Sequence, residues 1–265
     1  MYVKSFLMMA AVCAVLTYAS PRQALVDSLL NNFMIESCAG GANVPLKQCA
    51  EQKPKSPVAP RLITFLKWVD STGRISNDKI VEALLDRYKT FAAPVYANVL
   101  KTHGWPVDGD PNSPVTITMY FSATCPTCKT TYTVFHEAVT KGSLKGKAKL
   151  VSKPFSNTPQ NKALIAAHRL NKFSEFMQGL AKKGGRVDEN LVYAIADSLK
   201  MDKNIFKKLI EEDPEITRAL EESTHEGRAN GVELVPTIFM NGRRYNSSLD
   251  ARWIIDAALY TYETR

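Results

Sequence analysis

The chain has 265 residues, of which 45% are hydrophobic and 23% are charged, a balance typical of a globular protein with a buried core. Its length predicts one domain together with a smaller one. The formal net charge of +8 would suit a nucleic acid or an anionic membrane surface. The lysines are scattered, however, and no aromatic-basic platform or recognition motif accompanies them, so we expect no nucleic-acid partner.

The N-terminus has the pattern of a secretory signal peptide over residues 1–19. A short basic stretch, Met1 to Lys4, precedes an almost wholly apolar run from Phe6 to Leu16, and Ala19 offers a cleavage site before Ser20. The apolar run is short for a membrane span, although an uncleaved N-terminal anchor remains the alternative. We therefore expect a periplasmic or otherwise exported protein, anchored in the membrane if the segment is retained.

Removal of the signal peptide takes Cys13 with it and leaves two pairs of cysteines: Cys38 and Cys49, and Cys125 and Cys128. An even number of cysteines in an exported chain is compatible with disulfides. A chain of this size does not need them for stability. A chemical role is therefore the stronger explanation for at least one pair.

Residues 20–100 are predicted to form a small helical domain. Apolar residues recur at helical spacing before Cys38 and again from Arg61, where Gly73 ends the pattern and Ser76 can cap the next helix. Cys38 and Cys49 lie in the loop between these helices, and a helix end or kink is expected near Pro94. Residues 101–114 are rich in glycine, proline, aspartate and asparagine, which predicts a linker between domains.

Residues 115–265 predict an α/β domain. A strand from Val115 to Phe121 leads into the sequence Cys125-Pro126-Thr127-Cys128 and then a helix, and a second strand includes Ala148–Val151. A helical insert is expected over about 161–230. Helix caps are expected at Asp188, at Asp202 and at Asp213-Pro214. A hairpin turn is expected at Asn241-Gly242, after a strand over Thr237–Met240, and the last helix is expected to begin at Ser248.

The position of the Cys125-Pro126-Thr127-Cys128 motif favours redox chemistry over its other uses. Haem attachment requires a histidine where this chain has Lys129, and zinc requires further ligands that Cys38 and Cys49 are poorly spaced to supply. At a strand-to-helix junction, Cys125 would lie at the helix N-terminus, where a thiolate is stabilised. Cys128, one turn later, would close the ring or resolve a mixed disulfide. Pro126 fixes a backbone dihedral in that turn and Thr127 adds a hydroxyl; an inert buried disulfide is the alternative.

A second segment, Val235-Pro236-Thr237, places a proline at the start of a strand, where its missing N–H is tolerated. A cis bond there would leave backbone groups of Val235 free to pair with an extended substrate. An ordinary trans proline is the commoner arrangement and remains the alternative at this point.

Together these features resemble the DsbA-type branch of the thioredoxin superfamily. The resemblance rests on the cysteine motif after Phe121-Ser122, the helical insert, and the run from Gly231 to Gly242 around Val235-Pro236. It covers about Val115 to Arg265. It implies a thioredoxin-like fold with an inserted helical subdomain, an attacking Cys125, a resolving Cys128 and a cis Pro236.

Two departures from the DsbA pattern predict that the acidity of the two thiols differs from that in DsbA-type proteins. Met119 stands six positions before Cys125, where such proteins usually carry a buried carboxylate that helps to deprotonate the second thiol. The dipeptide inside the motif is Pro-Thr, whereas Pro-His is commonest in the branch. The residue before the proline, Val235, matches the oxidases better than the isomerases, which more often carry threonine at this position.

The N-terminal region faintly resembles the small helical CcmH-type domains of cytochrome c maturation. Those carry a close C-x-x-C, whereas ten residues separate Cys38 from Cys49 here. A structural disulfide between these two cysteines is one hypothesis, and a second redox pair that exchanges electrons with Cys125 is the other.

The sequence thus predicts an exported thiol–disulfide oxidoreductase that acts on exported client proteins, more as an oxidant than a reductant. A membrane or soluble redox partner would recycle its dithiol, and no cofactor or metal is expected beyond the redox-active Cys125–Cys128 pair. The alternatives are a reductase or isomerase, including one for cytochrome c maturation, and a non-enzymatic periplasmic chaperone or Cu(I)-binding module. No catalytic role is assigned to the histidines His103, His136, His168 and His225.

Overall fold

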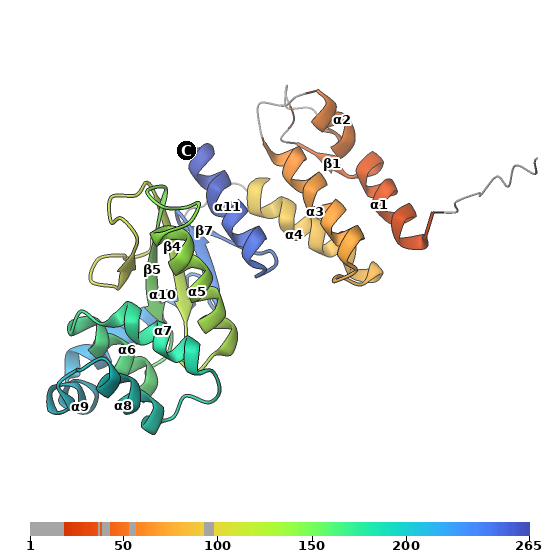
Figure 1. Ribbon diagram of the computed structural model, residues 1–265. Helices are drawn as coiled ribbons and strands as arrows, with labels where there is room; N and C mark the ends of the chain where they lie inside the picture. The colour runs from red at the N-terminus through yellow and green to blue at the C-terminus, as the bar shows by residue number, and fades with distance from the viewer. Residues whose placement is uncertain (1–18, 37, 39–42, 53–56, 93–97) are drawn as a thin grey trace, which may run out of the picture. The chain divides into compact units, whose positions relative to one another are not determined.

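The computed structural model describes residues 19–36, 38, 43–52, 57–92 and 98–265 (Figure 1). The predicted signal peptide, apart from Ala19, lies outside these residues, as does Pro94. Among the described residues, no helix combines the length and the apolar character needed to cross a membrane. The chain divides into two compact units, Met1–Val81 and Glu82–Arg265, and each is described by itself.

The first unit is helical, with one short hairpin. Its elements are α1 (Pro21–Asn32), β1 (Met34–Ile35), β2 (Val44–Pro45), α2 (Leu46–Glu51), α3 (Val58–Thr72) and the 3-10 helix η1 (Asn77–Lys79). Gly73 ends α3 with a φ of 63°, as its sequence position predicts. The start of α3 is predicted at Arg61 but lies at Val58. Pro60 falls in the first turn, where its missing N–H breaks no intrahelical hydrogen bond.

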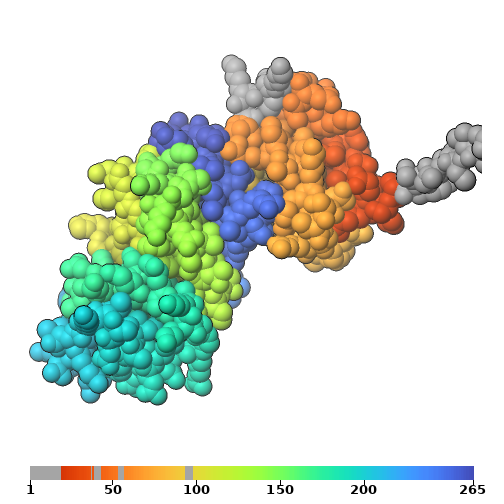
Figure 2. All heavy atoms as spheres, viewed as in Figure 1, coloured from red at the N-terminus to blue at the C-terminus, as the bar shows by residue number. Residues whose placement is uncertain are grey.

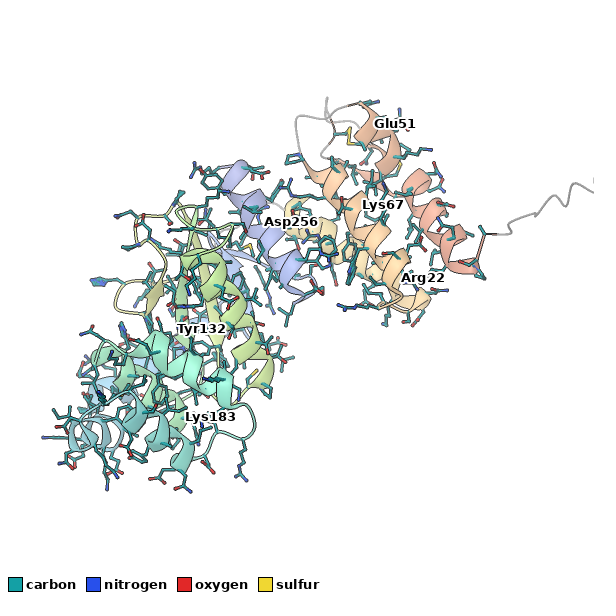
Figure 3. The ribbon with its side chains drawn as sticks, in the orientation of Figure 1. Arg22, Glu51, Lys67, Tyr132, Lys183 and Asp256 are labelled. Atoms are coloured by element: carbon teal, nitrogen blue, oxygen red, sulfur yellow. A yellow bond between two sulfur atoms is a disulfide. The ribbon has the colours of Figure 1, made fainter. Side chains whose placement is uncertain are left out.

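Helix α4 (Ile80–Ala92) begins at the boundary and continues into the second unit, where a buried arginine joins it to the C-terminal helix α11 (Ala251–Glu263). Arg87 is 0% exposed, donates to the carbonyl of Trp253 at 2.9 Å, and forms an ion pair with Asp256, labelled in Figure 3. Its guanidinium also lies over the ring of Phe91. A buried guanidinium needs such partners, so these contacts fix α4 against α11.

A mixed sheet forms the centre of the second unit. Its strands are β3 (Val107–Asp108), β4 (Val115–Phe121), β5 (Ala148–Pro154), β6 (Thr237–Met240) and β7 (Arg243–Arg244), in the order β3-β5-β4-β6-β7. Strands β4 and β5 are parallel, and the other pairs are antiparallel. The segment 101–114, predicted as a linker, supplies β3. Its backbone pairs with Leu150 and Val151, so it belongs to the folded sheet.

Helices cover both faces of this sheet because successive strand residues point to opposite sides. Helices α5 (Pro126–Thr140) and α11 pack together on one face, the face that carries Phe121. Helix α10 (Pro214–Ala229) packs on the other face, which carries Tyr120. It approaches closely at Gly227, where a Cβ atom would come within 3.0 Å of the Tyr120 ring.

The helical insert follows β5 and comprises α6 (Pro159–Arg169), α7 (Phe173–Lys183), α8 (Glu189–Ser198), α9 (Lys203–Glu211) and α10. Its helices pack on one another, and α7 packs against α5 (Figure 2). Asp188, Asp202 and Asp213 each accept a backbone N–H at the start of a helix, so all three predicted caps are confirmed. The mixed sheet with helices on both faces, together with this insert, makes the fold thioredoxin-like with an inserted helical subdomain, as predicted.

The C-terminal elements confirm the hairpin and correct the last helix. Asn241 and Gly242 have φ values of 48° and 78°, as the turn between β6 and β7 requires. The last helix is predicted from Ser248 but begins at Ala251, because Asp250 is its N-cap and accepts from the N–H of Arg252. The Ser248 hydroxyl accepts from the N–H of Asp250 and so shapes the loop before the helix.

Candidate dithiol active site

The motif Cys125-Pro126-Thr127-Cys128 spans the junction between β4 and α5. Cys125 is the N-cap of α5, with extended backbone angles, and Pro126 occupies the first helical turn. The Cys125 Sγ accepts a hydrogen bond from the N–H of Cys128 at 3.2 Å. The sulfur thus takes the place of an N-cap oxygen, where a free backbone N–H and the helix dipole both favour negative charge.

The two thiols of the motif differ in their access to solvent. Both are free cysteines; Cys125 is partly exposed, whereas Cys128 is 0% exposed. Burial, followed by the hydrogen bond with Cys125, raises the pKa of the Cys128 thiol well above its ordinary value. Pro126 and Thr127 are exposed and form the surface around Cys125. An external reactant therefore meets Cys125 first.

The segment around Val235 lies directly beside this thiol. The Val235–Pro236 peptide bond is cis, and the Val235 carbonyl oxygen lies 3.7 Å from the Cys125 Sγ. The sheet explains the approach, because β6 pairs with β4 and places Thr237 opposite Tyr120. The side chain of Val235 packs on a cluster that includes Tyr120 and Phe239. Two segments 110 residues apart are thereby brought to one site.

A buried asparagine, which sequence reasoning missed, supports the loop before the motif. Asn161 is 0% exposed; its Oδ1 accepts from the N–H of Ala123 at 2.9 Å, and its Nδ2 donates to the carbonyls of Phe155 and Ser156. One side chain therefore satisfies three backbone groups that link the active loop to the end of β5. Its position near the start of a helix offers no sequence pattern from which this role could be predicted.

Met119 is fully buried on the α5 face, as expected for a residue that replaces a buried carboxylate. On the α10 face lies a charged pair that the sequence analysis did not identify. Lys153, 0% exposed, pairs with Glu226 and lies over the Tyr120 ring at 5.4 Å. Burial lowers the pKa of Lys153 from its ordinary value, while Glu226 opposes this shift. Because β4 residues alternate, this pair and Met119 lie on opposite faces of the sheet.

The histidines are placed as follows. His136 Nδ1 lies 3.0 Å from the buried Asp108 carboxylate, and Ser174 donates to the same oxygen. The other ring nitrogen of His136 lies 3.1 Å from Gln178 Nε2. Burial lowers the pKa of His168. That none of them is catalytic stays a prediction.

The other cysteine pair, in the first unit, is a disulfide. Cys38 and Cys49 are bonded, with a Cα–Cα distance of 5.5 Å, and their residues are 6% and 0% exposed. Thiol–disulfide exchange requires a thiolate to reach a sulfur atom. A bond this buried is shielded from such attack, which favours the structural hypothesis over a second redox pair.

Comparison with known proteins places the second unit in a family. The sequence model of a family described as thioredoxin matches residues 101–256, which is more than half of the chain. The chain belongs to the thioredoxin family. No curated protein matches it in sequence. Within the thioredoxin match lie both halves of the site, the cysteine motif and the Val235-Pro236 segment.

Solved structures share the thioredoxin fold with this chain. A thioredoxin-like oxidoreductase from Silicibacter pomeroyi is 21% identical, with a TM-score of 0.54, and covers 61% of this chain and 94% of its own. The thiol-disulfide exchange protein alpha-DsbA2 from Wolbachia pipientis is 15% identical, with a TM-score of 0.52, and covers 70% and 97%. A periplasmic thioredoxin-like protein from Salmonella enterica serovar Typhimurium is 11% identical, with a TM-score of 0.52, and covers 67% and 97%. The predicted DsbA-type fold is confirmed by these similarities.

Proposed function

We propose that this protein is an exported thiol–disulfide oxidoreductase that oxidises client proteins through Cys125 and Cys128. One observation carries the proposal: a partly exposed thiol at a helix N-terminus lies 3.7 Å from the backbone carbonyl of Val235. The sulfur can react, and an extended client segment can pair with the backbone at Val235. The thioredoxin family and the fold shared with a thiol-disulfide exchange protein support the same chemistry.

The reaction begins with the oxidised form, in which Cys125 and Cys128 are bonded. A client thiolate attacks the Cys125 sulfur, the bond to Cys128 breaks, and the Cys128 sulfur takes up a proton. The second client thiolate then attacks the client sulfur of this mixed disulfide and releases Cys125 as a thiolate at the helix N-terminus. The client loses two electrons and the dithiol gains them, so a membrane or soluble redox partner must reoxidise the protein.

Export rests on the basic and apolar pattern of residues 1–19 and on the even cysteine number that follows it. A periplasmic protein that shares the fold supports the same location. The buried Cys38–Cys49 disulfide fits a compartment that is oxidising. The domain division proposed here is a small helical domain, predicted over residues 20–100, and a thioredoxin-like domain over residues 115–265, to which α4 and β3 also contribute.

The reduction potential of the Cys125–Cys128 couple tests the oxidising direction. The N-cap position of Cys125 stabilises the reduced form, but the motif lacks histidine, so we expect a potential of roughly −130 to −220 mV, between the strongest oxidants and thioredoxin. Equilibration of the mature protein with glutathione buffers measures it. A potential at or below that of thioredoxin would replace the oxidase hypothesis with a reductase.

A further inference from the structure

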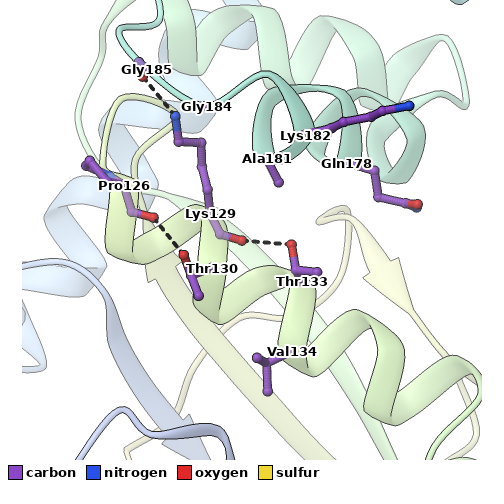
Figure 4. Close-up of a pocket in the computed structure, with 10 residues that line it drawn as sticks. All are labelled: Pro126, Lys129, Thr130, Thr133, Val134, Gln178, Ala181, Lys182, Gly184 and Gly185. Carbon is purple, nitrogen blue, oxygen red and sulfur yellow. Dashed lines mark hydrogen bonds between the residues drawn. The ribbon is translucent and has the colours of Figure 1, made fainter.

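A groove lies beside the dithiol, between α5 and α7, with a volume of about 590 Å³ (Figure 4). Pro126, Lys129 and Val134 line it from α5. Gln178 and Lys182 line it from α7, and the turn after α7 closes one end. Because Pro126 directly follows Cys125, the groove begins next to the reactive thiol and leads away from it along α5.

The lining of the groove includes a buried cation. Lys129 is 4% exposed, and its Nζ donates to the carbonyl of Gly185 at 3.1 Å. Gly184 and Gly185 both have positive φ values, 63° and 66°, which glycine adopts without strain and which shape the turn that carries this carbonyl. An ammonium group has three N–H donors, and a single carbonyl satisfies only part of that capacity.

The groove carries positive charge without compensation. Its lining includes no acidic residue. In the part of the chain that the structure describes, neither Lys129 nor Lys182 forms an ion pair with a carboxylate. A buried ammonium that lacks a counter-ion is costly, so a carboxylate that enters the groove gains a charge-assisted hydrogen bond and relieves that cost.

The length of the groove sets where the carboxylate would lie. At 1.5 Å per residue, α5 rises about 6 Å from Cys125 to Lys129 and about 12 Å from Pro126 to Val134, which an extended peptide covers in about two and about four residues. We propose that the groove binds an acidic side chain of the client polypeptide, about two to four residues from the client's reacting cysteine, with Lys129 as the carboxylate-binding residue. This inference deepens the proposed function, on which it rests, by naming a class of preferred client.

Binding of thiol-free peptides tests the groove apart from the redox chemistry. Two peptides carry serine in place of the reacting cysteine and either glutamate or glutamine three residues away. The full-length protein should bind the glutamate peptide about tenfold more tightly, as expected for a hydrogen bond to a charged group, and salt should reduce the difference. Isothermal titration at low and high salt measures both. Equal affinities for the two peptides at low salt would overturn the proposal.

Matched lysine variants locate the effect. The Lys129→Gln variant should lose the preference for glutamate almost completely, and Lys182→Gln, at the exposed rim, should lose part of it. Lys145→Gln changes an exposed lysine outside the groove lining and should retain the full preference. A preference that survives in both groove variants, or that falls equally in Lys145→Gln, would assign the effect to general charge and reject the groove.

Oxidation of the corresponding dithiol peptides separates this inference from the proposed function. Each peptide carries two cysteines, with glutamate or glutamine three residues from the first. The oxidised protein should convert both to disulfides and the glutamate peptide about fivefold to tenfold faster, in line with its tighter binding. Failure to oxidise either peptide would reject the proposed function, whereas oxidation of both at equal rates would reject the groove.

Discussion

The two cysteine pairs of this protein contain the same chemical group in opposite settings. Cys38 and Cys49 are bonded and buried in the first unit. Cys125 is partly exposed at the start of α5, and Cys128 lies buried one turn later. The difference predicts that backbone position and access decide reactivity here. A cysteine at a helix N-terminus receives N–H donors and can be attacked, whereas a buried disulfide within a small helical unit can only hold its loop together.

Serine substitutions at Cys125 and at Cys128 should have the largest effects and should show that the two thiols of the motif have different roles. Cys125→Ser removes the only sulfur of the motif that clients can reach, so disulfide formation in a dithiol peptide should fall to the uncatalysed rate. Cys128→Ser should instead trap mixed disulfides between Cys125 and client proteins, because the resolving thiol is lost. Non-reducing gels and mass spectrometry distinguish the two. Mixed disulfides in the Cys125→Ser variant would reverse the assignment.

Removal of the first pair should affect stability and not chemistry. The double variant Cys38→Ala, Cys49→Ala opens a short loop, since the two residues are 11 positions apart. The free energy of unfolding should fall by about 3 kcal/mol, as expected when a loop of this size loses its cross-link. Denaturant titration measures the loss, and peptide oxidation provides the control. A variant that keeps its stability but loses activity would point to a redox relay through Cys38 and Cys49.

Asn161 offers a test of how the active loop is supported. Asn161→Ala leaves the N–H of Ala123 and two carbonyls without their side-chain partner. The variant should lose about 2 kcal/mol of unfolding free energy, the cost of unsatisfied buried backbone groups. Asn157→Ala, an exposed asparagine nearby, is the matched control and should change stability little. Equal losses in the two variants would show that the loop does not depend on Asn161.

The smallest effect concerns the pH dependence of the buried thiol. Burial raises the pKa of Cys128 in the folded protein above its ordinary value of 9.0. Above pH 9 the unfolded chain releases this proton while the folded one keeps it, so the stability that the neutral thiol contributes is present below pH 9 and is lost as the pH rises. The slope approaches about 1.4 kcal/mol per pH unit. Reduced protein and Cys128→Ala, unfolded in denaturant between pH 8 and pH 10, should diverge. Parallel curves would contradict the shift.

Local patterns in the sequence were sufficient to predict many elements of this structure. The β4–α5 junction at Cys125, the three aspartate caps and the Asn241-Gly242 turn each depend on a few neighbouring residues, and all are confirmed. The starts of α3 and α11 were each predicted three residues from their true positions, whereas the larger error involves a distant partner. Val107 and Asp108 look like linker because their strand pairing depends on β5, which lies about 40 residues away.

The same limit applies to the site. The burial of Asn161, Lys129 and Lys153 could not be predicted, because burial of a polar side chain is decided by segments remote in sequence. Asn161 acquires its partners from the loop before Cys125 and from the end of β5. By contrast, the approach of Val235 to Cys125 was implied by the resemblance to DsbA-type proteins, which rests on two motifs that are specific in combination although neither is specific alone.

The order of the cysteines along the chain has a consequence for how the protein matures. Cys125 lies 3.7 Å from the carbonyl oxygen of Val235, which is synthesised 110 residues later, so the thiol lacks this neighbour while the rest of the domain is made. During that time it could be captured by Cys38 or Cys49. Closing the short loop between Cys38 and Cys49 costs about 2 kcal/mol less entropy than joining Cys49 to Cys125. Proximity in sequence thus directs each cysteine to its own neighbour before the fold exists to do so.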